Sequence, residues 1–384
     1  MSRVVNLPGG PITLSGHGSE FAVPGPQFTS RVGYAAAHVV ADPRAENIPG
    51  APPVIDWEAT LAFRRHLWSH GFGVAEAMDT AQRGMGLDYP AARELIHRSA
   101  AEAKAAGGTV AAGVATDQLP PGPASLDDIR KAYADQLVDV QEAGAEPVLM
   151  CSRHLAAAAD SAEQYLDLYG ALLDESDVPV ILHWLGPAFD PLLSGYWGSD
   201  DPHRAAETVA ELIAAHPGRV DGIKLSLLDE DFEVRLRRRL PAGVRMYTGD
   251  DFNYPALIRG DDRGHSDALL GIFAAIAPPA AAALRALDAG DLAAYDRILD
   301  PTVTLSRHLF RAPTWYYKTG IVFLAWLAGH QDHFTMIGGA QSGRSPAHLA
   351  ELIRLADAAG LLPDADLAAA RARAFFTTAG VSQP

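Results

Sequence analysis

TVAAGVA at residues 109–115, EPVLMC at 146–151 and VPVILHW at 178–184 are the stretches that decide the fold. Each is a nearly continuous apolar run of strand length, which is typical of a parallel strand buried on both faces. Segments with helical apolar spacing separate the runs, and strand–helix–strand order indicates parallel βα units. The central part of the chain therefore predicts an α/β fold.

The same alternation continues on both sides of this region. The further runs are GYAAAHVVA from Gly33, GFGVAEAM from Gly71, VDGIKLS from Val220, VRMYTGD from Val244 and SDALLGIF from Ser266. Eight βα units predict a closed (β/α)8 TIM barrel over residues 33–275. Residues 1–32, with turn signals at Pro8-Gly9-Gly10, form an N-terminal extension that could be a hairpin, and residues 276–384 form a C-terminal helical segment packed on the barrel.

Composition excludes several classes of protein. The chain has 384 residues, 48% of them hydrophobic and 20% charged, which favours a large folded core over disorder. A formal net charge of −16 argues against nucleic acid or an anionic membrane as a partner. The single cysteine allows no internal disulfide, and no apolar stretch is long enough for a signal peptide or a membrane span. We therefore expect a cytoplasmic protein with a small-molecule substrate.

Lysine is rare in this chain, so each lysine is informative. Only four occur, at positions 104, 131, 224 and 318, and the other basic residues are arginine. Lys224 lies inside the apolar run VDGIKLS, near the end of the sixth predicted strand, where active sites of barrel enzymes lie. Burial there would lower its pKa and leave a neutral amine that can form a Schiff base with a carbonyl compound. The alternative is a structural lysine paired with a carboxylate. Lys318, in TWYYKTG, could also lie near the site.

Polar residues at the other strand ends are further candidates. His183 ends the fifth strand, next to Lys224, and could move protons during catalysis, or it could be a structural histidine. The predicted substrate-binding residues are Asp79, Thr80, Cys151, Ser152, Trp184, Ser226, Gly249, Asp250 and Asp251. The aspartates could instead cap loops, and Cys151 could be a buried small side chain.

These residues carry a family resemblance. Gly222-Ile223-Lys224, the stretch VILHW before it and YTGDD at residues 247–251 resemble the dihydrodipicolinate synthase / N-acetylneuraminate lyase family of class I aldolase barrels. The resemblance covers roughly residues 33–380. It implies a Schiff-base lysine at Lys224, no cofactor, and a homo-oligomer, either a dimer or a tetramer.

The departures from the family pattern bear on the substrate. His183 stands where the family has a tyrosine, and Cys151-Ser152 where it has a tyrosine pair. MDTAQ, residues 78–82, replaces the loop that binds the pyruvate carboxylate, and GPAFDP at 186–191 lacks the usual arginine. The chain therefore resembles a longer, divergent branch, and we expect a keto-sugar or sugar-acid derivative rather than plain pyruvate. Carboxylates would accept hydrogen bonds from its hydroxyls, and Trp184 or Trp315 would stack on its apolar face.

Two other functions fit the same barrel. A divalent-metal-dependent sugar isomerase or epimerase would draw its ligands from several strand ends. Its candidate ligands are Glu76, Asp79, His154, His183, Asp250 and His265. A non-catalytic sugar-binding barrel would keep its ligand binding and biological activity when Lys224 is replaced by Arg.

Overall fold

A computed structural model describes residues 2–384 and contains a closed barrel of eight parallel strands. The strands are β3 (Gly33–Ala36), β4 (Gly73–Glu76), β5 (Val110–Val114), β6 (Glu146–Leu149), β7 (Val180–Leu185), β8 (Val220–Ser226), β9 (Arg245–Thr248) and β10 (Asp267–Leu270). They pair in chain order, and β10 closes the circle by pairing with β3. Each strand falls in one of the eight predicted runs, so the predicted TIM barrel is confirmed.

Strict side-chain alternation separates the inside of the barrel from its outside. Along β7, Ile181 belongs to a cluster inside the barrel, whereas Leu182 packs with the surrounding helices. Tyr34 and Tyr247 fill part of the barrel interior, with ring centroids 6.3 Å apart. Because the interior is filled by side chains, only the open ends of the barrel are available for a ligand.

Thirteen α-helices are described. They are α1 (Trp57–Ser69), α2 (Tyr89–Ala106), α3 (Leu126–Ala143), α4 (Arg153–Ala158), α5 (Ala162–Glu175), α6 (Pro202–Ala215), α7 (Glu230–Arg237), α8 (Tyr254–Arg259), α9 (Phe273–Asp288), α10 (Leu292–Leu309), α11 (Tyr317–Leu327), α12 (Pro346–Ala358) and α13 (Ala365–Thr378). Local sequence explains their ends. Asp88 accepts a hydrogen bond from Ala91 N at the start of α2, and Gly107 ends it at φ 70°, where only glycine is unstrained.

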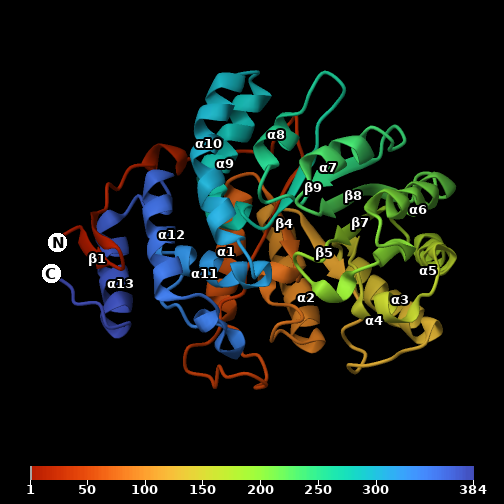
Figure 1. Cartoon of the computed structure of the whole chain (residues 1–384), viewed down its shortest axis with the longest axis horizontal. Helices are drawn as coiled ribbons and strands as arrows, with labels where there is room; N and C mark the ends of the chain where they lie inside the picture. The colour runs from red at the N-terminus through yellow and green to blue at the C-terminus, as the bar shows by residue number, and fades with distance from the viewer. Residues whose placement is uncertain (1) are drawn as a thin grey trace.

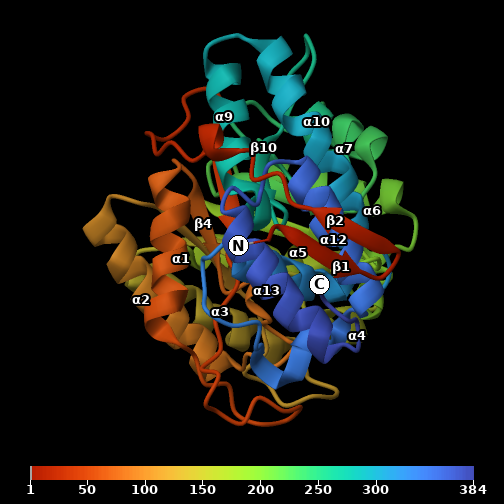
Figure 2. The ribbon, with the colours of Figure 1, turned by 90° about the vertical axis from the view of Figure 1, so that its left-hand side faces the viewer.

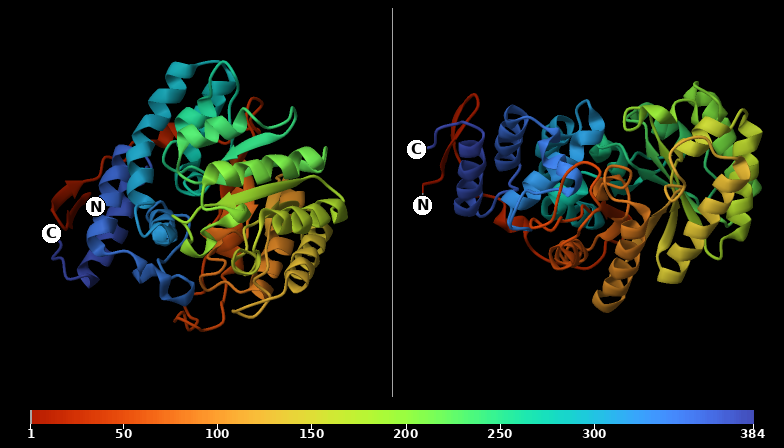
Figure 3. Two further views of the ribbon diagram at one scale, coloured as in Figure 1. Left: turned by 45° about the vertical axis from the view of Figure 1, so that its right-hand side comes forward. Right: turned by 90° about the horizontal axis from the view of Figure 1, so that it is seen from below.

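The N-terminal extension contains an antiparallel hairpin of β1 (Val4–Leu7) and β2 (Gly10–Thr13). The hairpin lies on α12 and α13 (Figure 2), where Arg354 of α12 donates to the carbonyls of Pro8 and Gly10. Both chain ends lie at this end of the molecule (Figure 1), where Asn6 Nδ2 donates to the Ser382 carbonyl at 2.8 Å. Seen from below, the C-terminal helices separate the hairpin from the barrel (Figure 3). No helix within residues 2–384 has the length and apolar character to cross a membrane.

One C-terminal helix reaches back over the barrel. At the N-terminus of α11, the Tyr317 hydroxyl lies 2.7 Å from Thr80 Oγ1, which follows β4. Tyr317 also stacks on Phe310, with ring centroids 4.3 Å apart, and lies edge-on to Phe189 beyond β7. Gly271, at the end of β10, makes room for this aromatic group, because a Cβ there would lie 2.9 Å from Phe310 Cζ. The helical segment therefore closes one side of the barrel mouth.

Glu233 of α7 ties together the ends of two strands. Its carboxyl accepts hydrogen bonds from Thr248 Oγ1 at 3.0 Å and Ser266 Oγ at 2.7 Å. Burial raises the pKa of Glu233 to about 8. The folded protein therefore keeps the proton over a pH interval in which the unfolded chain releases it, so the free energy of unfolding falls as pH rises from 4.5 to about 8.

Replacing Glu233 by Gln tests this dependence. The neutral amide does not ionise, so Glu233→Gln should become more stable than wild type above pH 8, by on the order of 1 to 3 kcal/mol. Urea unfolding of both proteins at pH 5, 7 and 9 measures the difference. Glu94→Gln, at an exposed position on α2, is the control and should show no such divergence. Parallel pH profiles for wild type and Glu233→Gln would contradict the assignment.

Candidate active site

Lys224 points into the barrel at its carboxyl end. On β8, Ile223 and Leu225 pack outward with the helices, so Lys224 and Ser226 face inward. Lys224 is 7% exposed, and burial lowers the pKa of its amine, while the charges of Asp79 and Asp251 oppose that shift. Removal from water thus favours the neutral, nucleophilic amine over the ammonium ion.

His183 lies beside Lys224 on the neighbouring strand. The two residues are register partners in the β7–β8 ladder. His183 is fully buried, its Nε2 lies 3.3 Å from Ser226 Oγ, and its Nδ1 has no hydrogen-bond partner among the described residues. Burial, together with the positive charge of Lys224, lowers the pKa of His183 well below its usual value. The imidazole is therefore neutral at physiological pH and does not act as an imidazolium acid.

Asp251 is the acidic neighbour of Lys224. It follows β9, and its Oδ1 accepts a hydrogen bond from Ile272 N at 2.8 Å. Burial raises the pKa of Asp251 to about 7, although the charge of Lys224 opposes the shift. Burial therefore pushes both Lys224 and Asp251 toward their neutral forms, although the charge of each opposes the shift of the other.

Gly249 permits the close packing of this group. A Cβ at position 249 would lie 2.2 Å from Ser226 Oγ and 2.9 Å from Lys224 Cε. No side chain fits in that space, so the glycine is required by the approach of the lysine. The backbone hydrogen bond from Gly249 N to Leu225 O, 2.8 Å long, fixes the strand end.

Asp79 reaches the site because the backbone turns sharply after β4. Ala77 has φ 49°, an unfavourable conformation for alanine. Glu76 holds this turn: its Oε1 accepts the Ala77 N–H at 2.9 Å. Glu76 in turn forms a fully buried two-bond ion pair with Arg64 of α1, with both N–O distances 2.8 Å. The ion pair thus fixes the carboxylate that supports the turn between β4 and Asp79.

Two adjacent cavities lie over the barrel mouth. The inner one has a volume of about 10 Å³, roughly one water molecule, and is bordered by Lys224, Asp251 and the aromatic group. The outer one has a volume of about 450 Å³, within the usual range for a small-molecule site. The residues that border both cavities are Asp79, Leu185, Phe189 and Tyr317. A ligand in the outer cavity therefore lies next to the space in front of Lys224.

The structure gathers part of the predicted set around the inner cavity. The predicted residues that border it or contact those that do are Lys224, His183, Asp79, Thr80, Ser226, Gly249 and Asp251. Sequence reasoning missed Phe189, Tyr317 and Arg83, which also line the cavities. Lys318 and Trp315, noted from the sequence, line the outer one.

Four predicted substrate-binding residues lie elsewhere or serve the fold. Trp184 faces the helices, where its ring meets Trp197 and Phe232, because it follows the inward-facing His183 on β7. Ser152 caps α4 by accepting from Leu155 N at 3.2 Å.

Asp250 and Cys151 are likewise engaged by the protein itself. Asp250 accepts hydrogen bonds from Phe252 N at 2.8 Å and Asn253 N at 3.0 Å, which is a loop cap. Cys151 Sγ donates to the His183 carbonyl at 3.1 Å, and burial raises the pKa of this thiol to about 12, so it remains protonated. These contacts favour the structural alternatives for these residues.

The residues of the metal-site hypothesis do not converge. Glu76 points outward to Arg64, and His154 hydrogen-bonds Thr116 Oγ1 and the Pro120 carbonyl. His265 precedes β10 and so lies at the opposite end of the barrel. Within the described part of the chain, no group of three or more His, Cys, Asp or Glu side chains is placed to hold a metal ion.

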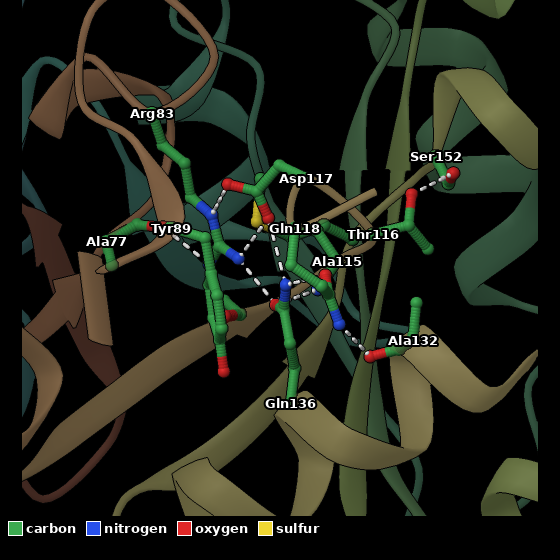
Figure 4. Close-up of polar contacts among 12 residues, drawn as sticks. Ala77, Arg83, Tyr89, Ala115, Thr116, Asp117, Gln118, Ala132, Gln136 and Ser152 are labelled. Atoms are coloured by element: carbon green, nitrogen blue, oxygen red, sulfur yellow. Dashed lines mark hydrogen bonds and ion pairs between the residues drawn. The ribbon is translucent and has the colours of Figure 1, made fainter. Parts of the chain in front are cut away.

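Arg83 lines the outer cavity but is fully engaged by the protein. It follows the turn after β4 and forms two hydrogen bonds with Asp117, at 2.9 and 2.6 Å. Its remaining N–H groups donate to Gln136 and to the carbonyls of Ala77 and Gly113, as Figure 4 shows for the labelled partners. All five donors are used, so Arg83 stiffens the cavity wall and has none left for a ligand.

Comparisons with known proteins agree with this architecture. The profile of the family described as "Protein of unknown function (DUF993)" matches residues 12–381. No curated protein matches the sequence. Among solved structures, dihydrodipicolinate synthase from Aquifex aeolicus is similar with a TM-score of 0.66 at 14% identity, covering 86% of this chain and 99% of that one.

Two further structures resemble the chain to the same degree. YagE from E. coli K12, a prophage protein of the dihydrodipicolinic acid synthase family solved with pyruvate, has a TM-score of 0.67, 14% identity and coverage of 86% and 99%. Dihydrodipicolinate synthase from Acinetobacter baumannii, complexed with pyruvate, has a TM-score of 0.63, 16% identity and coverage of 87% and 100%. At these identities the likeness concerns the fold, and it agrees with the resemblance seen in the sequence.

The buried Arg64–Glu76 pair should be essential to the strand end that carries Asp79. Glu76→Gln leaves the Arg64 guanidinium without a counter-charge, so we expect a loss of about 3 to 5 kcal/mol in the free energy of unfolding. Urea unfolding measures it. The double variant Arg64→Met, Glu76→Leu removes both charges and should recover part of the loss, since the Ala77 N–H and the Ser99 hydroxyl still lose their acceptor. A loss under about 1 kcal/mol for Glu76→Gln, the value of an exposed pair, would contradict this role.

Proposed function

The chain belongs to the DUF993 family, and we propose that it is a Schiff-base-forming lyase of the class I aldolase type. The single observation that carries the proposal is a buried lysine with lowered pKa at the carboxyl end of the sixth barrel strand, beside the carboxyl of Asp251. Carbonyl chemistry by an amine needs a neutral nucleophile and a nearby proton donor.

Lys224, Asp251 and His183 have separate roles in forming the imine. The Lys224 Nζ lone pair attacks the carbonyl carbon while the carbonyl oxygen takes up a proton. A second proton then goes to that oxygen, which leaves as water, and the C=N bond of the imine forms. The nitrogen gives up its two protons to neighbouring acceptors in these steps, so that the two protons gained by the oxygen are balanced. We assign proton delivery to Asp251, whose pKa of about 7 keeps part of it protonated at neutral pH. His183, being neutral, acts as an acceptor or relay through Ser226.

The substrate we propose is a keto-sugar or sugar-acid derivative. The outer cavity offers about 450 Å³ beyond the lysine, more room than a three-carbon acid needs. Asp79 borders both cavities and can accept hydrogen bonds from hydroxyl groups between the carbonyl and the far end of the substrate. Retro-aldol cleavage and dehydration both begin from the same imine.

Borohydride trapping tests the proposal. A panel of aldehydes, ketones and keto acids with borohydride should give a covalent adduct whose mass maps to Lys224, and trapping should fall at least about a hundredfold in Lys224→Met, which lacks the nucleophile. Lys104→Met, the same substitution at an exposed position of α2, is the matched control and should label as wild type does. Because burial lowers the pKa of Lys224, trapping should remain efficient at pH 7, where an ordinary lysine is protonated.

Two results would count against a Schiff-base lyase. One is the absence of any adduct at Lys224 across the panel. The other is labelling spread equally over Lys104, Lys131 and Lys224, which would show that burial does not activate Lys224.

A further inference from the structure

The outer cavity contains three cationic side chains that differ in how their charge is compensated. Arg83 is paired with Asp117 at 2.6 Å, and Arg153 with Asp190 at 2.6 Å. Lys318, from the first turn of α11, forms no ion pair with a described carboxylate. Among the described residues it is therefore the one cation of this cavity wall that has no carboxylate within ion-pair distance, although the more distant charges of Asp79 and Asp190 act on it.

Lys318 is also poorly hydrogen-bonded for a buried ammonium. It is 5% exposed, and its Nζ has one polar contact, 3.2 Å to Met85 Sδ. A thioether is a weak acceptor, and an ammonium has three donors. Burial lowers the pKa of Lys318, while the charge of Asp79 opposes this shift. A charged ammonium in this position lowers the stability of the folded protein unless a ligand binds to it.

The place of Lys318 suggests where such a partner comes from. Lys318 lines the outer cavity, and the adjacent Tyr317 borders both the outer and the inner cavity. Asp79 and Phe189 likewise border both. A molecule that contacts Lys318 thus extends toward Lys224 along a continuous wall.

Building on the proposed lyase function, we propose that Lys318 binds an oxyanion group of the substrate, a carboxylate or a phosphate, while the substrate carbonyl reaches Lys224. An oxyanion both accepts the free N–H donors and compensates the charge, which a hydroxyl group does not. The guanidinium of Arg153, half of whose side chain is exposed at the rim, adds positive potential for an incoming anion. The anion-binding residue would thus come from the C-terminal helical segment and not from a barrel loop.

A direct binding experiment separates this subsite from the lyase chemistry. Inorganic phosphate and succinate are titrated by calorimetry into Lys224→Met, which cannot form an imine. At least one of them should bind, and adding Lys318→Met should weaken that binding at least about tenfold. Lys104→Met in the same background is the matched control and should not change it. Phosphate alone binding identifies a phosphorylated substrate, and succinate alone a carboxylic acid.

Lys318→Met preserves length and removes a buried charge, so it should fold with wild-type or higher stability in urea. Binding of neither anion to the folded Lys224→Met protein, or equal binding with and without Lys318→Met, would overturn the subsite.

Borohydride trapping with matched acidic and neutral carbonyl compounds tests whether the anion subsite takes part in the reaction at Lys224. Glyceraldehyde 3-phosphate against glyceraldehyde, and succinic semialdehyde against butanal, differ in the acid group. At least one acidic member should label Lys224 at a concentration about tenfold lower than its neutral partner. Lys318→Met should abolish the preference, and Lys318→Arg should restore part of it.

The outcomes distinguish the two proposals. Anion binding that depends on Lys318, with no label on Lys224, overturns the lyase and keeps the anion site. Label on Lys224 without preference for the acidic compounds keeps the lyase and overturns the subsite. Label on Lys318 overturns both, because it would make Lys318 the nucleophile.

Discussion

An ammonium group inside a closed barrel has to lose its proton, find a carboxylate or bind a ligand, and the strand ends around Lys224 are arranged by that requirement. Strand alternation turns Lys224 inward, where its side chain is buried and borders a cavity with room for only about one water molecule. Asp251 and Asp79 supply negative charge from two other strand ends, and Gly249 leaves the space that the lysine occupies. The result is a pair, Lys224 and Asp251, in which burial favours the neutral form of both members.

Much of this arrangement follows from local sequence. Eight apolar runs of strand length fix the number and order of the strands, and the inward direction of Lys224 follows from its place among apolar neighbours in VDGIKLS. The pairing of His183 with Lys224 follows as well, because consecutive parallel strands lie side by side. Barrel topology therefore makes the centre of the site predictable from one sequence.

Other parts of the site depend on information that no local pattern contains. Trp184 and Asp250 stand at strand ends like the residues that border the inner cavity, but Trp184 faces the helices and Asp250 caps its own loop. An error of one residue in the alternation along a strand moves each side chain to the opposite face of the sheet. Strand limits are known from sequence only to within a few residues. Tyr317 and Phe189 come from segments whose path over the barrel mouth depends on tertiary packing. The sequence pointed to this region only through Lys318, by the rarity of lysine, and through Trp315, as an aromatic residue able to stack on a sugar.

The two buried lysines differ in a way that constrains any substrate. Lys224 is near carboxylates that can exchange protons with it, as a reacting amine requires, whereas Lys318 touches a thioether and an aromatic ring and has no group to exchange with. A nucleophile benefits from a nearby proton acceptor, whereas a binding cation benefits when no carboxylate lies within ion-pair distance to compete with the ligand. Asp79 lies on the wall between them and affects the pKa of both. A molecule that satisfies all three has a carbonyl at one end, an acid at the other and hydrogen-bond donors between, which is the pattern of a hydroxylated keto acid or sugar phosphate.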